Sequence, residues 1–155
     1  MGKVQVAQEI RTLVSVYRDE VLTDRTRCVR LRGRKCHPEI ITTLLGLEVR
    51  AGKKRITCPD MTTARYLKLF SELGLATVQI PYDPTQTARI LPRLETAFER
   101  LNESLDSAST GKNQRLAEKR RAYAKLRRYV EEDCTPGENQ KLATSSSMVP
   151  RTRDA

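Results

Sequence analysis

The sequence predicts an α+β protein in which helices pack on a mostly antiparallel four-stranded sheet, followed by a C-terminal basic helix and a disordered tail. Short segments that alternate apolar and polar residues, as strands do, are interspersed with longer segments whose apolar residues recur every three or four positions, as in helices. The length of 155 residues provides for one domain plus tails. No apolar run approaches the ~18 residues of a membrane span, and the N-terminus lacks the apolar segment of a signal peptide, so we expect a cytoplasmic protein that does not engage membranes.

The first sixty residues predict one helix and three strands. Apolar residues recur at spacings of three and four in the first segment, whereas the other three alternate or are rich in β-branched residues. The expected elements are a helix over residues 4–22 and strands over 26–32, 40–50 and 55–58. Gly52 stands between the last two strands, where it adopts a positive φ at little cost. We therefore expect these two strands to be antiparallel neighbours.

The middle of the chain predicts two further helices around one strand. The expected elements are a helix over 61–73, a strand over 75–80 and a helix from 84 to 105. Asp60 and Asp83 are the expected N-cap residues, and Gly74 is the expected left-handed terminator of the first helix. Pro92 interrupts the apolar pattern of the second helix, because an interior proline removes a backbone hydrogen bond. A kink or a restart is expected there.

The composition divides the chain into three regions. They are a compact α+β domain over 1–106, a linker and basic amphipathic helix over 107–133, and a disordered tail over 134–155. The apolar stripe of the basic helix is thin and consists of Leu116, Tyr123, Leu126 and Val130. A stripe of this size predicts weak packing on the domain.

Positive charge is the strongest functional signal. The chain holds 29 Lys and Arg against 19 Asp and Glu, which gives a net charge of +10 and a pI near 9.8. Segments 25–35, 50–55 and 112–128 carry 18 of the 29 basic residues. Phosphate groups relieve such local repulsion by pairing with Lys and Arg and releasing counterions. The first hypothesis is therefore a non-enzymatic protein that binds the backbone of RNA or DNA, free or in a ribonucleoprotein.

The basic side chains expected to contact phosphate lie in the first three predicted strands, in the loop and the turn between them, and in the basic helix. They are Arg30, Arg32, Arg34, Lys35, Lys53, Lys54, Arg55, Arg120, Arg121, Arg127 and Arg128. If the first three strands are neighbours, those on the strands and their turn form one continuous surface. The chain has no Trp, and Phe70 and Phe98 stand at core positions. Few aromatic side chains are therefore available to stack on nucleic-acid bases. Backbone or structured-RNA recognition fits better.

A second hypothesis is a metal-dependent nuclease. The stretches Pro38-Glu39 and Glu48-Val49-Arg50, in the order helix, strand, strand, strand, helix, strand, resemble the core of the PD-(D/E)xK nuclease superfamily. The resemblance implies that Glu39 and Glu48 hold metal ions for phosphodiester cleavage, with Glu9 on the preceding helix. Glu39 replaces the usual Asp, and Arg50 replaces a Lys and stays protonated. A third hypothesis is an adaptor that binds an acidic protein surface. The leucine series 91–105 can face the sheet or a second subunit, which leaves the oligomeric state open.

The cysteines and the single histidine raise a zinc hypothesis. Cys28, Cys36, His37 and Cys58 carry the ligand types that zinc prefers. Structural zinc sites usually present Cys-x2-4-Cys pairs, and this spacing is absent, so reduced thiols without a metal are the favoured interpretation. The sequence also lacks a phosphate loop, a dinucleotide fingerprint and a nucleophile elbow. We expect no cofactor.

Overall fold

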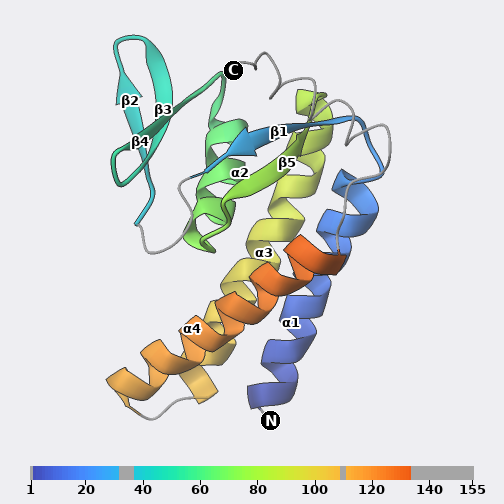
Figure 1. Ribbon diagram of the computed structural model, residues 1–155, viewed down its shortest axis with the longest axis vertical. Helices are drawn as coiled ribbons and strands as arrows, with labels where there is room; N and C mark the ends of the chain where they lie inside the picture. Colours follow the sequence, from blue (N-terminus) through green and yellow to red (C-terminus); the bar gives the residue numbers. More distant parts are fainter. Residues whose placement is uncertain (1, 32–36, 109–110, 134–155) are drawn as a thin grey trace, which may run out of the picture.

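The structure is a computed structural model that describes residues 2–31, 37–108 and 111–133, and it has the expected α+β class (Figure 1). The elements are α1 (Gly2–Val16), the π-helical turn η1 (Tyr17–Val21), β1 (Thr26–Arg30), β2 (Glu39–Thr43), β3 (Gly46–Ala51), β4 (Lys54–Cys58), α2 (Met61–Glu72), β5 (Thr77–Pro81), α3 (Pro84–Ala108), α4 (Lys112–Arg128) and the π-helical turn η2 (Tyr129–Asp133). No helix among these residues is long and apolar enough to cross a membrane. The predicted tail 134–155 lies outside the described residues.

The strands form two antiparallel sheets, so the expected single four-stranded sheet is wrong. One sheet holds β1 and β5, and the other holds β2, β3 and β4 in that order. The segment 40–50, expected to be one strand, is a hairpin that turns at Leu44 and Leu45 and re-enters the sheet at Gly46, whose φ is +125°. β1 pairs with β5 and is not part of this three-stranded sheet.

Local capping chemistry agrees with the sequence. The side chain of Asp60 accepts a hydrogen bond of 2.7 Å from the Thr63 backbone N–H at the start of α2. Gly52 and Gly74 have positive φ values of 64° and 88°, which confirms their expected roles in a turn and at a helix end. α3 runs without a break through Pro92, so the expected restart is wrong. Pro92 lies on the exposed side of α3, while Leu91 and Leu94 hold the helix against the core.

On the side of β5 that does not pair with β1, two tyrosine hydroxyls hydrogen-bond to the backbone of Gln79. The backbone N–H of Gln79 donates a 2.9 Å hydrogen bond to the hydroxyl of Tyr17, and the hydroxyl of Tyr66 donates one of 2.7 Å to the carbonyl of Gln79. Burial raises the pKa of Tyr66 well above its usual range, so its hydroxyl stays neutral and able to donate. These bonds satisfy backbone groups that a third strand would otherwise pair, and they fix β5 to η1 and α2.

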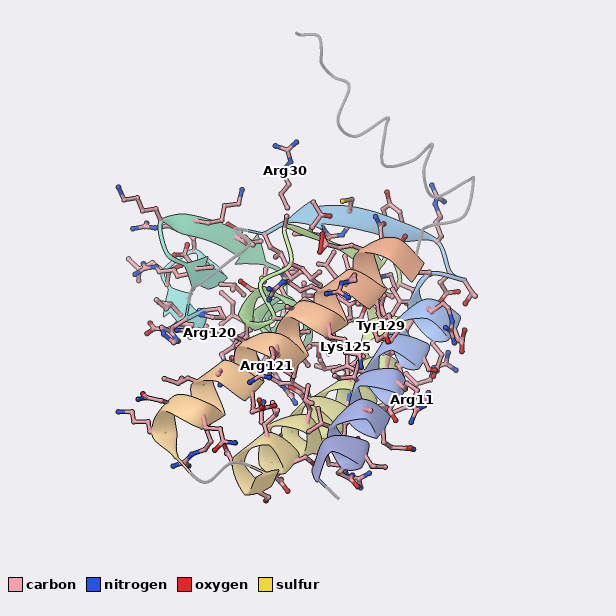
Figure 2. The ribbon with its side chains drawn as sticks, turned by 60° about the horizontal axis from the view of Figure 1, so that its bottom comes forward. Arg11, Arg30, Arg120, Arg121, Lys125 and Tyr129 are labelled. Atoms are coloured by element: carbon pink, nitrogen blue, oxygen red, sulfur yellow. The ribbon has the colours of Figure 1, made fainter. Side chains whose placement is uncertain are left out.

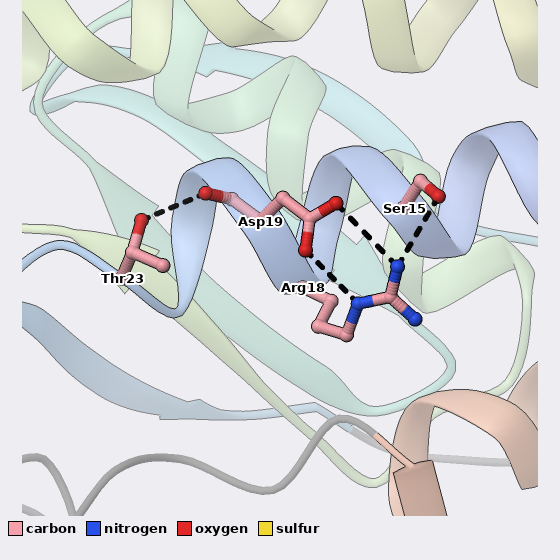
Figure 3. Close-up of polar contacts among 4 residues, drawn as sticks. All are labelled: Ser15, Arg18, Asp19 and Thr23. Carbon is pink, nitrogen blue, oxygen red and sulfur yellow. Dashed lines mark hydrogen bonds and ion pairs between the residues drawn. The ribbon is translucent and has the colours of Figure 1, made fainter.

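The π-helical turn η1 is held by exposed polar contacts (Figure 3). The Nε atom of Arg18 donates to Oδ1 of Asp19 at 3.0 Å, and its Nη2 lies 3.5 Å from the hydroxyl of Ser15. The hydroxyl of Thr23 donates to the backbone carbonyl of Asp19 at 2.8 Å. The hydrogen bond from Arg18 lowers the pKa of Asp19. These contacts order the end of the first helix, which packs along α3 (Figure 1).

Candidate nucleic-acid interface

Helix α4 is seated on the domain by its apolar stripe. Tyr123, Leu126 and Val130 are buried in the same core as the other helices, whereas Leu116 is 46% exposed. The hydroxyl of Tyr123 donates a 2.7 Å hydrogen bond to Oδ1 of Asn102 in α3. In Figure 1, α4 crosses α3 and α1, and it contacts both helices. One side of α4 is therefore fixed to the domain.

The opposite side of α4 carries exposed basic residues. Because an α-helix repeats every 3.6 residues, the burial of Tyr123 and Leu126 directs Arg121 and Arg128 away from the core. Arg120, Arg121 and Lys125 project from α4 in Figure 2. Arg121 pairs with Glu118 at 3.0 Å, and the amine of Lys125 lies 5.9 Å from the centre of the Tyr129 ring.

Two of these arginines keep their full donor capacity. Within the described parts of the chain, neither Arg120 nor Arg128 makes an ion pair or a side-chain hydrogen bond, and both are exposed. A guanidinium in this state can offer two parallel N–H donors to a phosphate without breaking an existing contact. Both residues therefore belong to the part of the predicted phosphate-contact set that is exposed and accessible to a ligand.

A basic cleft lies at the start of α4. It has a volume of about 340 Å³ and lies between α3 and α4, with Lys112, Arg115 and Lys119 contributing positive charge and Asp106 the single carboxylate. The amine of Lys119 also lies 5.5 Å from the centre of the Tyr123 ring. Sequence reasoning did not single out this cleft, because it exists only where the two helices meet. Its excess of positive charge suits an anion such as a phosphate group.

Arg11 is a second residue that sequence reasoning missed. It is exposed on α1, a helix that contacts α4, and it points outward in Figure 2. The segments with clustered charge do not include it, so no sequence signal marked it. Helix packing places α1, which carries this charge, in contact with α4.

Arg127, one of the predicted phosphate contacts, has a structural partner. Its Nη1 atom donates a 2.7 Å hydrogen bond to the backbone carbonyl of Leu73 at the end of α2, and its side chain is half-buried. The bond satisfies a carbonyl that the helix leaves without an internal partner. Arg127 thus anchors α4, in addition to any contact that its remaining N–H groups make.

The predicted contacts on the first strand are only partly described. Arg30 is exposed at the end of β1 and stands apart from the labelled α4 residues in Figure 2. Arg32, Arg34 and Lys35 lie outside the described residues. The condition for one continuous surface, that the first three predicted strands are neighbours, is not met, because β1 pairs with β5. The strand pairing that was to join Arg30 to the 53–55 turn is therefore not the observed one.

The predicted contacts on the second sheet lie among carboxylates. Lys53 lies in the β3–β4 turn, Lys54 and Arg55 begin β4, and all three are exposed. In the register of the sheet, Arg50 lies between Glu39 on one side and Arg55 on the other, so all three share one face. Glu48 is also on this face. Glu39 and Glu48 thus offset part of the positive charge of this region.

The nuclease residues are brought together, but Glu48 is paired with Arg50. Glu39, Glu48 and Arg50 lie on one face of the second sheet, and Oε1 of Glu48 is 3.0 Å from Nε of Arg50. Glu48 is only 16% exposed. Glu9 is buried in α1 and accepts a 2.7 Å hydrogen bond from Gln5. Among the described residues, no group of three or more His, Cys, Asp or Glu side chains could hold a metal ion.

The candidate zinc ligands are distributed over different elements. Cys28 lies in β1 and Cys58 at the end of β4, and both are free thiols whose pKa values are raised, mainly by burial. His37 is exposed next to β2, and Cys36 lies outside the described residues. A zinc ligand must be a thiolate, which a raised pKa disfavours in the metal-free protein.

Comparisons with known proteins add no further constraint. No family model matches the chain, and neither a curated protein nor a solved structure matches it. The functional interpretation therefore depends on the geometry and charge described above.

Proposed function

We propose that the protein binds the phosphate backbone of RNA or DNA through α4, without chemistry of its own. The observation that supports this most strongly is the basic cleft formed by Lys112, Arg115 and Lys119 at the start of the helix. Exposed Arg120 and Arg128, which have no partners among the described residues, extend the positive charge along the helix. Nucleic acid supplies the negative charge that this surface lacks.

The seating of α4 makes the surface ready for binding. Its buried stripe and the hydrogen bond between Tyr123 and Asn102 hold the helix on α3 before any ligand arrives. A preformed array of donors binds without the entropic cost of ordering a segment. Contacts of this type fix position on the backbone and carry little base identity.

The other predicted contacts form a secondary region in this proposal. Arg30 at the end of β1 and Lys53, Lys54 and Arg55 on the second sheet add attraction for a longer nucleic acid. The proposal also keeps the other predicted contacts of segment 25–35, which follow Arg30 in the sequence: Arg32, Arg34 and Lys35. The partner is nucleic acid, free or in a ribonucleoprotein, and the location is the cytoplasm, a reducing compartment in which free thiols such as Cys28 and Cys58 persist.

The test is binding of the purified full chain to a labelled duplex DNA and to a structured RNA over a salt series, with and without Mg²⁺. The proposal expects affinity that falls steeply with salt and nucleic acid that stays intact on a denaturing gel. Cleavage that requires Mg²⁺ and disappears in Glu48→Ala would replace it with the nuclease. Absence of binding at low salt would refute it and favour an adaptor for an acidic protein surface.

A further inference from the structure

The two edges of the three-stranded sheet differ in their protection. Natural edge strands usually carry Lys, Pro or a bulge that prevents pairing with another chain. The β4 edge is protected in this way by exposed Lys54 and Arg55. After Glu39, the β2 edge consists of Ile40, Ile41, Thr42 and Thr43. In the part of the chain that the structure describes, β2 pairs with β3 and leaves its other side open.

The turn that follows β2 presents two leucines to solvent. Leu44 is 105% exposed and Leu45 is 95% exposed. Two-residue hairpin turns favour Asn, Asp and Gly, so turn formation does not account for leucines here. The hydroxyl of Thr43 accepts a 3.2 Å hydrogen bond from the Leu45 N–H and donates one of 3.0 Å to the carbonyl of Gly46. The turn is therefore ordered, and it holds both leucines outward.

A cleft with an apolar floor lies at the other end of β2. Its volume is about 730 Å³, and Ile40, Leu69 and Phe98 contribute apolar lining between β2, α2 and α3. Ion pairs between Arg65 and Glu95 and between Lys68 and Glu72 occupy its rim. The cleft is thus concave and partly apolar, and the charges named at its rim are already paired.

We propose that two copies of this chain pair through their β2 strands, antiparallel about a two-fold axis centred on Ile41. Centring on the middle residue of β2 pairs all of the strand: Ile41 with Ile41, Ile40 with Thr42 and Glu39 with Thr43 of the other copy. No like charges are directly opposite in this register. Continuing it by one residue brings Leu44 opposite Pro38, a lining residue of the other copy's cleft. Each copy then completes the cleft of the other.

A second copy fits these features better than a nucleic acid or a lipid surface does. The leucine turn is uncharged, and the basic residues Lys53 and Lys54 lie at the opposite end of the hairpin, because successive turns of an antiparallel meander alternate ends. An anionic membrane surface requires positive charge beside the apolar anchor. A concave, partly apolar surface can bury such exposed side chains, and this chain supplies one whose lining includes Pro38, the residue that the register places opposite Leu44.

The pairing predicts a six-stranded antiparallel sheet with strand order β4-β3-β2-β2-β3-β4. It is an isologous interface, so it closes at two copies. Five residues of strand and two leucines form a small contact, which makes the dimer dependent on concentration. This inference is independent of the proposed nucleic-acid binding, because α4 takes no part in it.

The first test is sedimentation velocity of the full chain from about 1 µM to about 1 mM, the range in which small interfaces dissociate. The matched variants are Ile41→Lys and Thr57→Lys, whose positions flank Glu48 on one face of the sheet, on β2 and β4 respectively. We expect the wild type and Thr57→Lys to dimerise with rising concentration, and Ile41→Lys to stay monomeric with an unchanged circular dichroism spectrum. A monomeric wild type, or equal association of both variants, would overturn the pairing.

The second test examines the register in which the two β2 strands pair. Directly opposite residues of an antiparallel pair have Cα atoms about 4.5 to 5.5 Å apart, which is within the range that a disulfide bridges. Ile41→Cys should therefore form a disulfide between positions 41 of two copies under mild oxidation, identified by peptide mapping. Thr57→Cys should form no corresponding link. Links in Ile41→Cys that involve only the native cysteines would contradict the two-fold at Ile41.

Discussion

Nη1 of Arg127 in α4 donates a 2.7 Å hydrogen bond to the carbonyl oxygen of Leu73, which ends α2. This bond joins α4 to α2 through two residues that are 54 positions apart in sequence. It caps α2 and ties the C-terminal end of α4 to it. Hence Arg127, although it lies in a highly charged segment, has a structural role: it holds two helices together.

Replacing Arg127 with Ala should lower the free energy of unfolding by about 1.5 to 3 kcal/mol, because a buried carbonyl loses a charged donor. Arg128→Ala is the matched control, since the neighbouring arginine is exposed and makes no such bond. Its expected cost is within about 0.5 kcal/mol. Urea unfolding followed by circular dichroism measures both, and equal losses would show that the bond to Leu73 does not stabilise the protein.

Tyr66→Phe should destabilise the protein by about 1 to 3 kcal/mol, because it leaves the carbonyl of Gln79 buried without a partner. Phe preserves the ring, which packs 4.9 Å from that of Phe70, so little packing is lost. Tyr82→Phe serves as the control, since Tyr82 is 50% exposed. If both variants unfold at the same urea concentration, the tyrosine is not needed to close the side of β5.

Alkaline pH should unfold the protein through its buried tyrosines. Burial raises the pKa of Tyr66 and of Tyr123 above the unfolded value of about 10. Above that pH the unfolded chain loses these protons while the folded chain keeps them, so the stabilisation present below pH 10 is lost as pH rises towards the folded pKa values. Stability measured in urea from pH 8 to 11.5 should therefore fall above about pH 10, and less steeply in Tyr123→Phe. A flat profile would contradict the burial of these hydroxyls.

The basic turn of the second sheet should contribute less to binding than α4. Replacing Lys53, Lys54 and Arg55 together with Gln removes three positive charges from the end of the sheet where Arg55 shares a face with Glu39 and Glu48. The salt dependence of duplex binding should then change by less than the roughly 2.7 units that three lost phosphate contacts would give. A decrease of roughly 2.7 units in the slope of log K against log salt would place the turn within the primary contact surface.

Local chemistry explains which parts of the fold were predictable. Asp60, Gly52 and Gly74 have roles set by their own side chains or backbone freedom, and these positions were predicted correctly. The hairpin at Leu44 and Leu45 was missed, because a turn made of leucines carries no turn signal. The pairing of β1 with β5 was missed for a different reason. It depends on which strands stay available once β2, β3 and β4 have paired with one another. The residues of β1 and β5 alone do not reveal which partner each strand will take.

The same distinction holds for the candidate site. Clustering of charge in the sequence identified Arg120, Arg121 and Arg128, and the structure places all of them on the exposed side of α4. The cleft in which Lys112 lies near Asp106 arises from the packing of α3 against α4. Arg11 lies on a third helix, α1. Spacing along one segment cannot reveal such combinations, because they depend on how helices cross.

The most direct test of the account compares the salt dependence of duplex DNA binding between two charge-matched triple variants. Arg120→Gln, Arg121→Gln and Arg128→Gln remove three positive charges from α4, and Arg89→Gln, Arg93→Gln and Arg100→Gln remove three exposed ones from α3. The account predicts that the slope of log K against log salt falls by about 2.7 in the α4 variant and stays at the wild-type value in the α3 variant. Equal slopes in the two variants would show that net charge, and not α4, governs binding.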